Sequence, residues 1–360
     1  MSFLYKKMKE NKEDLEYEKF ETDNINNKPK RKQSSSYIFY FLLIPIIISI
    51  LLFGFNYFSN KNNLIIIPPN EKNTILCPFD NGIRVMQQFK RGVYGASNAP
   101  ELIFKYLFNK TPKNIIPVKQ YNTNKNEDSY KGHEEITKYI SKFDPPFLVL
   151  GGDHSITYPI VKGLNENLKN KKLGLIYFDA HYDLRPFEGE NQDILSSGNS
   201  FYRIIKNKEI NGENIVAIGI KKGTSEIFKT MDDFAHKNKM TVFYSDEIND
   251  QNYKKIMEKA LEIASKGADG IYLSFDVDLI DAKYVPGCSC PAIENGFNLD
   301  WAKEMVAMGK FIAADIVETS NREKNYKGEE DKDGNKKLDI SAKTDVEIIS
   351  NMNFIKLNNW

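Results

Sequence analysis

The chain has 360 residues, of which 41% are hydrophobic, so it can bury the core of one large α/β domain or of two ordinary ones. Its 50 Lys and Arg against 49 Asp and Glu give a formal net charge of +1, which argues against a nucleic-acid-binding protein, since these usually carry a basic excess. Three cysteines make no disulfide framework, and Cys288 with Cys290 lacks the second pair that a structural zinc site needs.

The first 80 residues do not follow a globular pattern. Residues 1–36 form a polar tail that ends in a basic cluster, and no charged residue occurs from 33 to 60. Residues 37–58 are apolar with aromatic residues at both ends, and roughly 20 apolar residues suffice to cross a bilayer. We therefore expect a transmembrane helix at 37–58, a single-pass membrane localisation with the side of the following domain left open, and a linker at 59–80.

The remaining residues, 81–360, alternate between two kinds of segment. Apolar runs typical of β-strands lie at 83–89, 115–118, 147–150, 173–178, 215–220, 241–244, 271–275 and 311–317. Helix-like segments lie at 99–108, 156–168, 225–236, 253–264 and 301–308. This alternation predicts an α/β domain in which helices cover both faces of a parallel sheet. Residues 320–339 are densely charged without apolar periodicity, which predicts a solvated loop.

Three short motifs directly follow three of the apolar runs. Gly-Gly-Asp-His at 151–154 follows 147–150, Asp-Ala-His-Tyr-Asp at 179–183 follows 173–178, and Asp-Val-Asp at 276–278 follows 271–275. Because ligands of parallel α/β sheets bind beyond the carboxyl ends of the strands, all three motifs should meet at one edge. The candidate metal ligands are His154, Asp179, His181, Asp183, Asp276 and Asp278.

Two imidazoles and four carboxylates are enough to hold two divalent ions side by side. Residues two apart at a strand end point the same way, so Asp179 with His181, and Asp276 with Asp278, can converge. This oxygen-rich set suits Mn²⁺ better than a thiolate-type zinc site does, and a two-metal site generates hydroxide at neutral pH. We therefore predict a metallohydrolase, in which Asp153 holds a ligand by a hydrogen bond.

These motifs resemble those of the ureohydrolase superfamily, which contains arginase, agmatinase and formimidoylglutamase. The resemblance runs from about residue 82 to about residue 352 and includes Gly-Gly-Asp-His-Ser-Ile-Thr, Phe-Asp-Ala-His-Tyr-Asp, Ser-Phe-Asp-Val-Asp-Leu-Ile-Asp, and Asp-Ile-Val-Glu at 315–318. It implies a three-layer αβα domain around an eight-stranded parallel sheet. It also implies two manganese ions held by the six candidate ligands, and a homo-oligomer, usually a trimer or hexamer.

The loop after the second motif distinguishes members of this superfamily. Arginases and agmatinases carry a histidine there, whereas residues 196–203 read Ser-Ser-Gly-Asn-Ser-Phe-Tyr-Arg. Formimidoylglutamases lack that histidine too, and they also resemble this chain in Asp-Ala-His-Tyr-Asp-Leu-Arg-Pro at 179–186. They differ in often having Gly-Gly-Gly-His-Glu where this chain has Gly-Gly-Asp-His-Ser, and Thr-Pro where it has Asn199-Ser200.

The resemblance to formimidoylglutamase implies hydrolysis of N-formimidoyl-L-glutamate to L-glutamate and formamide. We expect Asp183 to protonate the leaving amine and Glu318 to pair with the cationic formimino group. Arg185 is a candidate partner for a substrate carboxylate, because guanidinium groups bind carboxylates in a bidentate fork; a structural salt bridge is the alternative. The residues expected to line the carboxylate pocket are Ser197, Gly198 and Asn199.

Two other functions stay open at this point. A guanidine ureohydrolase, either agmatinase or arginase, would release urea at the same metal site. An inactive, membrane-tethered binding protein would be expected to lose ligands, and none of the six is missing. The two remaining histidines, His133 and His236, lie in helix-like sequence and are expected at the surface.

Overall fold

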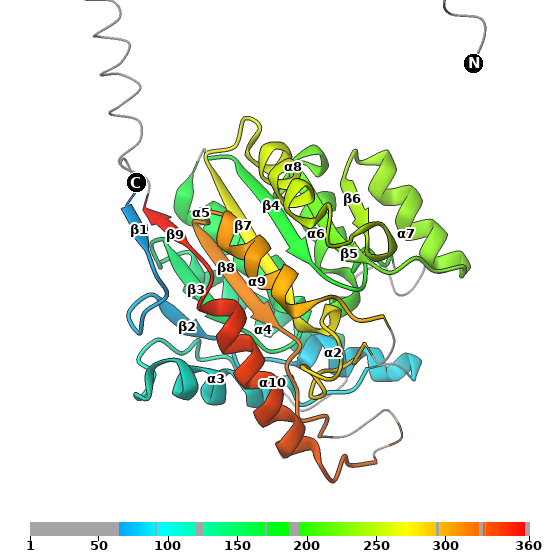
Figure 1. Cartoon of the computed structure of the whole chain (residues 1–360). Helices are drawn as coiled ribbons and strands as arrows, with labels where there is room; N and C mark the ends of the chain where they lie inside the picture. The colour runs from blue at the N-terminus through cyan, green and yellow to red at the C-terminus, as the bar shows by residue number, and fades with distance from the viewer. Residues whose placement is uncertain are drawn as a thin grey trace, which may run out of the picture. The chain divides into compact units, whose positions relative to one another are not determined.

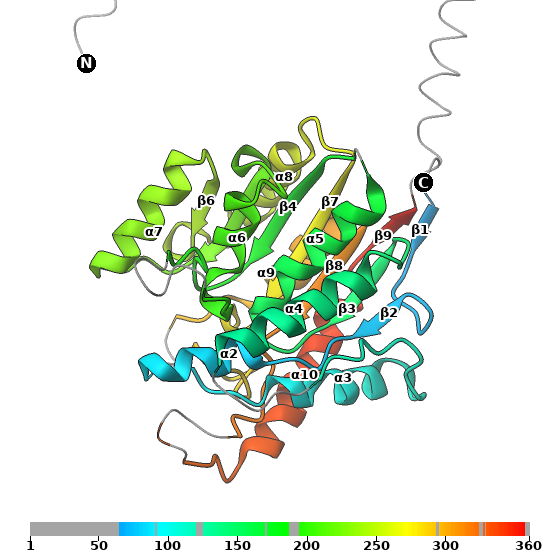
Figure 2. The ribbon, with the colours of Figure 1, turned by 180° about the vertical axis from the view of Figure 1, so that it is seen from behind.

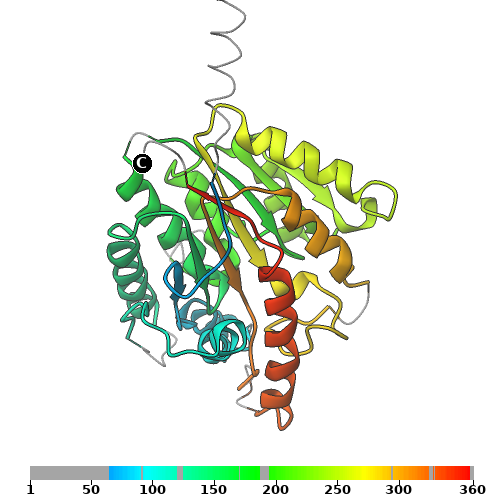
Figure 3. The ribbon, with the colours of Figure 1, turned by 60° about the vertical axis from the view of Figure 1, so that its left-hand side comes forward.

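The computed structural model describes residues 65–356, except for 91, 120–124, 170, 187–193, 293–294, 324–326 and 328. Seven strands form one parallel sheet (Figure 1), in the spatial order β2 (Thr74–Leu76), β3 (Phe147–Leu150), β8 (Ala313–Val317), β7 (Gly270–Asp276), β4 (Leu173–Phe178), β5 (Ile215–Ile220) and β6 (Thr241–Tyr244). β1 (Ile65–Ile67) and β9 (Phe354–Lys356) pair antiparallel as a separate sheet, seen in blue and red in Figure 3.

Helices cover both faces of the sheet, each set over its own hydrophobic core. One core contains buried residues of α3 (Ala99–Phe108), α8 (Tyr253–Ser265), α9 (Leu299–Met308) and α10 (Gly334–Ile349), and α9 and α10 lie in front in Figure 1. The other contains residues of α4 (Asn126–Ile140), α5 (Thr157–Leu168), α6 (Ser200–Lys206) and α7 (Glu226–Lys237), and α4 and α5 lie in front in Figure 2. Strands buried on both faces read as continuous apolar runs, which explains why β3, β4 and β5 were predicted.

The parallel α/β architecture is as predicted, but the expected eight-stranded sheet is wrong. Residues 115–118 contribute only a single parallel bridge, from Ile115 to Leu76 at the edge of β2. The amide of Val118 bonds back to Ile116 O at 2.7 Å, which makes a three-residue turn centred on Pro117. The chain therefore leaves the sheet after one bridge, and the sheet has seven strands.

Two further segments near the start of the domain differ from expectation. Residues 83–89, expected as a strand, form α2 (Asn81–Val85) and the 3-10 helix η1 (Met86–Phe89). All five residues of α2 are buried, and a segment this short carries no periodicity that separates helix from strand. Strands β1 and β2 lie within the range expected as a linker, 59–80. Similarly, α10 begins at Gly334, inside the range 320–339 expected as a loop.

The predicted membrane localisation also requires correction. Within the part of the chain that the structure describes, no helix combines the length and apolar character needed to cross a bilayer. The helix expected at 37–58 lies outside the described residues. Neither the transmembrane helix nor the single-pass membrane localisation is therefore retained.

Candidate metal centre

The three predicted motifs and Glu318 meet at one end of the sheet. The motifs follow the carboxyl ends of β3, β4 and β7, and Glu318 follows β8. These four strands are neighbours in the order β3-β8-β7-β4. The sheet thus places side chains that are far apart in sequence beside one another, as parallel strands require.

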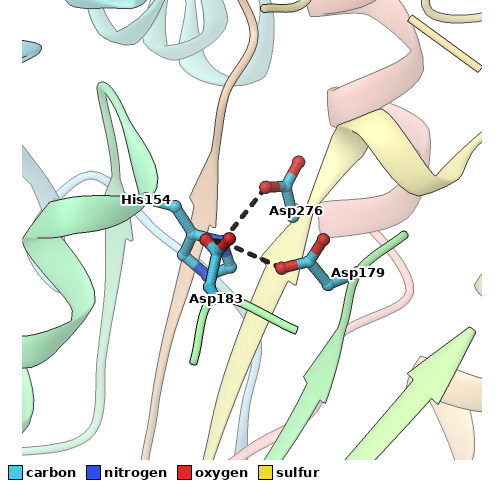
Figure 4. A group of neighbouring side chains, drawn as sticks. All are labelled: His154, Asp179, Asp183 and Asp276. Atoms are coloured by element: carbon cyan, nitrogen blue, oxygen red, sulfur yellow. Dashed lines mark ion pairs between the residues drawn. The ribbon is translucent and has the colours of Figure 1, made fainter. Parts of the chain in front are cut away.

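His154 is the centre of the first group of candidate ligands (Figure 4). Its Nδ1 atom lies 3.2 Å from Asp179 Oδ2, 3.2 Å from Asp183 Oδ2 and 3.0 Å from Asp276 Oδ2. His154 and Asp179 are fully buried, and Asp276 is nearly so. One nitrogen and three carboxylate oxygens are thus close enough to share a single ion.

A second group lies beside the first and shares one residue with it. His181 Nδ1 lies 2.9 Å from Asp278 Oδ2 and 3.6 Å from Asp179 Oδ1. Asp179 therefore presents one carboxylate oxygen to each group, which gives two ion positions side by side. The His181 side chain is 48% exposed, so the second group faces solvent.

A chain of buried hydrogen bonds orients the His154 ring. Its Nε2 atom lies 2.9 Å from Ser274 Oγ, and the Ser274 hydroxyl donates to Asp315 Oδ1 at 2.6 Å. Because the only hydroxyl proton of Ser274 goes to Asp315, Ser274 accepts from the N–H of His154. The hydroxyls of Thr157 and Tyr272 donate to Asp315 Oδ2, both at 2.7 Å. In the neutral imidazole the lone pair therefore lies on Nδ1, which faces the three carboxylates, as in a metal ligand.

The donor atoms of the two groups fit divalent cations. His154 Nδ1, Asp179 Oδ2 and Asp278 Oδ1 are buried without a hydrogen-bond partner, and such atoms are costly unless something pairs with them. Burial alone would lower the pKa of His154, but the adjacent carboxylates raise it well above its ordinary value. Burial and neighbouring carboxylates raise the pKa of Asp276 well above its usual range. A pair of cations would bind the unpartnered buried atoms and would offset the repulsion between the neighbouring carboxylates. An oxygen-rich donor set suits Mn²⁺.

Asp183 and Glu318 both adopt the left-handed backbone conformation, with φ of 45° and 71°. Residues other than glycine rarely do so, and such strain concentrates at functional sites. Hydrogen bonds hold each of them in place. The carbonyl of Asp183 accepts from the Phe201 amide at 3.2 Å, and the amide of Glu318 donates to Gly152 O at 2.8 Å.

Glu318 is attached to the turn that carries the first ligand. Its Oε1 accepts a hydrogen bond from the backbone amide of His154 at 2.6 Å. Burial and the carboxylate of Asp153 raise the pKa of Glu318 to about 8, and a hydrogen bond from Ser289 opposes this increase. A cation in the adjacent space would favour the ionised form of Glu318.

The turn after β3 requires glycine at position 152. A Cβ atom on Gly152 would lie 1.9 Å from Phe79 O, so a larger residue cannot fit. Asp153, expected to hold a ligand, makes other contacts instead. Its Oδ1 accepts from the Ser155 amide at 2.9 Å, and its Oδ2 accepts from the Ile83 amide at 2.6 Å.

A cavity of about 250 Å³ adjoins both ligand groups. Four of the five residues expected to contact the substrate line it, namely Arg185, Ser197, Gly198 and Glu318. Asn199 does not, because its side chain closes its own turn, with Oδ1 accepting from Ser196 N at 3.0 Å and Nδ2 donating to Ile194 O at 2.6 Å. The other lining residues are His181, Asp183, Asp276, Asp278, Ile83, Met86, Gly92, Ser289 and Cys290.

His181 is the only one of the four histidines that lines this cavity. His133 is buried rather than at the surface as expected. Its Nε2 lies 3.0 Å from Ser155 Oγ, and burial lowers its pKa to about 3. His236 is exposed on α7, as expected, and His154 is buried within the first ligand group. No histidine besides a candidate metal ligand is therefore available at this site.

Ser274 and Asp315 are the site residues that the sequence-based prediction missed. Asp315 is a charged residue in the middle of the apolar run 311–317, which signals a buried polar contact. Ser274 precedes Asp276 by two positions, so both side chains lie on the same face of β7. Both signals were present in the sequence.

The chain is similar to several known proteins. The model of the arginase family matches residues 90–328. A formimidoylglutamase of Halalkalibacterium halodurans is 32% identical over 149 residues, which cover 41% of this chain and 44% of that protein. A guanidinobutyrase of Pseudomonas aeruginosa is 31% identical over 179 residues, which cover 48% of this chain and 52% of that protein. The chain thus spans about half the length of the curated relatives it matches.

The fold is also similar to that of solved structures. The crystal structure of formimidoylglutamase from Bacillus subtilis matches with a TM-score of 0.60 at 21% identity, covering 77% of this chain and 85% of that one. An arginase structure from the same organism gives a TM-score of 0.58 at 23% identity. Likeness at this level of identity shows the fold.

Proposed function

The chain belongs to the arginase family, and from this premise we propose that it hydrolyses a C–N bond of a linear amidine. We propose N-formimidoyl-L-glutamate as the substrate, with L-glutamate and formamide as products. One observation carries the proposal. Two ligand groups that share Asp179 adjoin one cavity. Arg185 and a loop that contains no histidine line the same cavity.

Two Mn²⁺ ions are the proposed cofactors. His154, Asp179, Asp183 and Asp276 would hold one, and Asp179, His181 and Asp278 would hold the other. When bound, such a pair lowers the pKa of water and supplies hydroxide at neutral pH. The unpaired buried donor atoms of His154, Asp179 and Asp278 support this assignment.

The residues of the cavity wall would orient the substrate. Glu318 lies beside the ligand groups and is suited to pair with the cationic formimino group. Arg185 lines the same cavity and offers a fork of N–H donors for a carboxylate. The amide of Arg185 donates to Gly198 O at 2.9 Å, which joins it to the loop that also presents Ser197. This arrangement would place the scissile amidine next to the ligands.

The reaction then needs one addition and two proton transfers, because both protons of the water end on the glutamate nitrogen. The water oxygen adds to the formimino carbon, and the bond from that carbon to the glutamate nitrogen breaks. Asp183, held by its backbone at the cavity, would deliver the proton to the leaving amine. The products balance as glutamate plus formamide for one water consumed.

A guanidine substrate is the second candidate. The guanidinobutyrase that is 31% identical over 179 residues favours it, since a guanidinium is also a cation that Glu318 could bind. In that case the same site would release urea. The absence of a histidine from residues 196–203 supports the formimino substrate, because the arginases and agmatinases that the chain resembles carry one there.

A substrate panel tests the proposal. The full chain, loaded with manganese, is assayed with N-formimidoyl-L-glutamate, arginine, agmatine and 4-guanidinobutyrate. We expect formamide and glutamate from the first and no urea from the others. Urea without formamide would overturn the choice of substrate. Bound manganese with no hydrolysis of any compound would instead indicate an inactive binding protein.

We also propose that the chain assembles as a homo-oligomer, either a trimer or a hexamer. This proposal rests on its membership of the family. Sedimentation equilibrium of the purified protein measures the assembly mass, and a monomer at micromolar concentration would contradict it.

A further inference from the structure

One wall of the cavity is apolar and comes from the segment that follows β2. Ile83 in α2 and Met86 in η1 line the cavity, and they are only 5% and 6% exposed. They share that cavity with carboxylates and with Arg185. An apolar wall beside charged groups suits a substrate whose charged ends are joined by methylene groups.

Asp153 fixes this wall directly to the turn that bears His154. The Asp153 carboxylate is fully buried and accepts from the amide of Ile83 at 2.6 Å. Its other oxygen accepts from the amide of Ser155 at 2.9 Å. The packing is equally close, because a Cβ atom on Gly82 would lie 2.2 Å from Ser155 Oγ. The wall and the metal-binding turn therefore form one rigid unit.

A second buried carboxylate holds the same helix from its start. Asp80 is fully buried and accepts from Arg84 Nε at 2.7 Å and from the amide of Gly95 at 3.0 Å. Charge-assisted hydrogen bonds of this kind are the strong ones. With both ends of α2 held, Ile83 and Met86 have little freedom to move away from the cavity.

We propose that Asp153 is a positioning residue that fixes α2 relative to the metal ligands, and that Met86 thereby sets the length of substrate the cavity accepts. This inference rests on the proposed function, since it assumes an amidine substrate with a carboxylate at its far end. The amidine is placed by the ligand groups and Glu318, so the methylene count decides whether the far end reaches Arg185 without meeting Met86.

Substitution of Met86 tests the length limit. The substrates are N-formimidoyl-L-glutamate and its homologue with one more methylene, formimidoyl-2-aminoadipate. In Met86→Ala, we expect the kcat/KM of the longer compound relative to the shorter one to rise roughly tenfold, which is typical for one methylene in an apolar pocket. Phe89→Ala is the matched control, because Phe89 belongs to the same 3-10 helix but is 38% exposed and does not line the cavity. An unchanged ratio in Met86→Ala, or an equal rise in Phe89→Ala, would overturn the proposal.

Substitution of Asp153 tests the positioning role with a readout besides turnover. In Asp153→Asn one side-chain atom becomes an N–H donor, so one of the two amide bonds is lost. We expect faster hydrogen exchange at the Ile83 or the Ser155 amide, whichever loses its acceptor, together with the same change of length preference as in Met86→Ala. Asp246→Asn, on the surface, should leave the exchange rate as it is. Unchanged exchange at both the Ile83 and the Ser155 amides in Asp153→Asn would show that Asp153 does not join α2 to the turn.

The two tests separate this inference from the proposed function. If the wild-type protein hydrolyses no amidine, the proposed function fails and the length limit fails with it, while the exchange experiment still decides the role of Asp153. If the wild type is active and the length ratio does not respond to Met86, only the inference fails.

Discussion

The backbone amide of His154 donates a 2.6 Å hydrogen bond to Glu318 Oε1. This bond joins the turn after β3 to the end of β8, two neighbouring strands of the sheet. A candidate metal ligand and the carboxylate expected to bind the substrate cation are therefore held at a fixed separation. One oxygen of Glu318 accepts the hydrogen bond from the backbone, and a neutral side chain with the same oxygen can do so too. The charge of Glu318 and its structural role can therefore be tested separately.

Glu318→Gln should lower activity without loss of metal. The amide oxygen of glutamine still accepts from the His154 amide, so the turn is retained, but the negative charge is removed. We expect kcat/KM for the formimino substrate to fall on the order of 100-fold, the range for removing one electrostatic contact to the reacting group. Steady-state kinetics and manganese content check this. Loss of manganese in this variant would contradict the role given to Glu318.

Asp179→Asn should remove metal binding and activity together. Asp179 gives one oxygen to each ligand group, so both ion positions lose a charged donor. Manganese content after dialysis should fall well below that of the wild type. Asp246→Asn, exposed and not a member of either group, is the control and should keep its metal. Full manganese content in Asp179→Asn would refute the ligand assignment.

Ser274→Ala should weaken manganese binding without removing it. The substitution deletes the acceptor for the His154 Nε2–H, which orients the ring. Changes to groups that orient a ligand typically cost about 10–100-fold in metal affinity. Titration with manganese measures the change, and Ser265→Ala on the surface of α8 provides the comparison. An affinity equal to that of the wild type would show that Ser274 does not orient His154.

Arg185→Gln should affect substrates that carry a carboxylate more than those that do not. If the guanidinium binds the substrate carboxylate, KM for N-formimidoyl-L-glutamate rises while kcat changes less. We expect kcat/KM to fall about 10-fold or more, consistent with the loss of a hydrogen bond between charged groups. Agmatine, which has no carboxylate, should respond little if it is turned over at all. A uniform loss of activity, with reduced thermal stability, would indicate a structural salt bridge instead.

Asp345→Asn should stabilise the protein at alkaline pH. Asp345 is fully buried, accepts from Thr319 Oγ1 at 2.7 Å, and burial raises its pKa to about 8. In the unfolded chain the Asp345 carboxyl loses its proton near pH ~4. Its contribution to the free energy of unfolding is therefore complete below that pH and declines as the pH rises from there to about 8. Asparagine does not titrate. The melting temperature of the variant relative to wild type should therefore increase from pH 5 to pH 8.5.

Asp339→Asn, on the exposed face of the same helix, is the control for this measurement. Its carboxyl bonds to Lys343, which lowers its pKa, so the variant should gain nothing at alkaline pH. A difference between Asp345→Asn and wild type that is independent of pH would show that Asp345 is ionised in the folded protein.

Much of the fold could be predicted because its central strands are buried on both faces. β3, β4 and β5 are uninterrupted apolar runs, and the residues where they end mark the edge at which ligands gather. That edge brings all six candidate ligands together. The strand ends were thus sufficient to predict where the site lies.

The rest depended on contacts that a single sequence does not display. The role of Asp153 could not be predicted, because its partner, the amide of Ile83, lies 70 positions earlier in the chain. The sequence run at 83–89 reads as a strand, yet it is helical because Asp80 and Asp153 hold it there. Likewise, the hydrogen bond by which the side chain of Asn199 completes a local turn is not evident from the sequence.

The spatial order β3-β8-β7-β4 has a consequence for how this protein folds. The first group of candidate ligands comes from β3, β7 and β4, with β8 between β3 and β7, and its members His154 and Asp276 are more than 100 positions apart in the chain. No fragment that lacks β7 can bring the first group together, so the site forms only when most of the sheet has assembled. Because an ion binds only where the site is complete, it stabilises the folded domain relative to partly folded forms. Manganese should therefore raise the unfolding temperature of the whole domain.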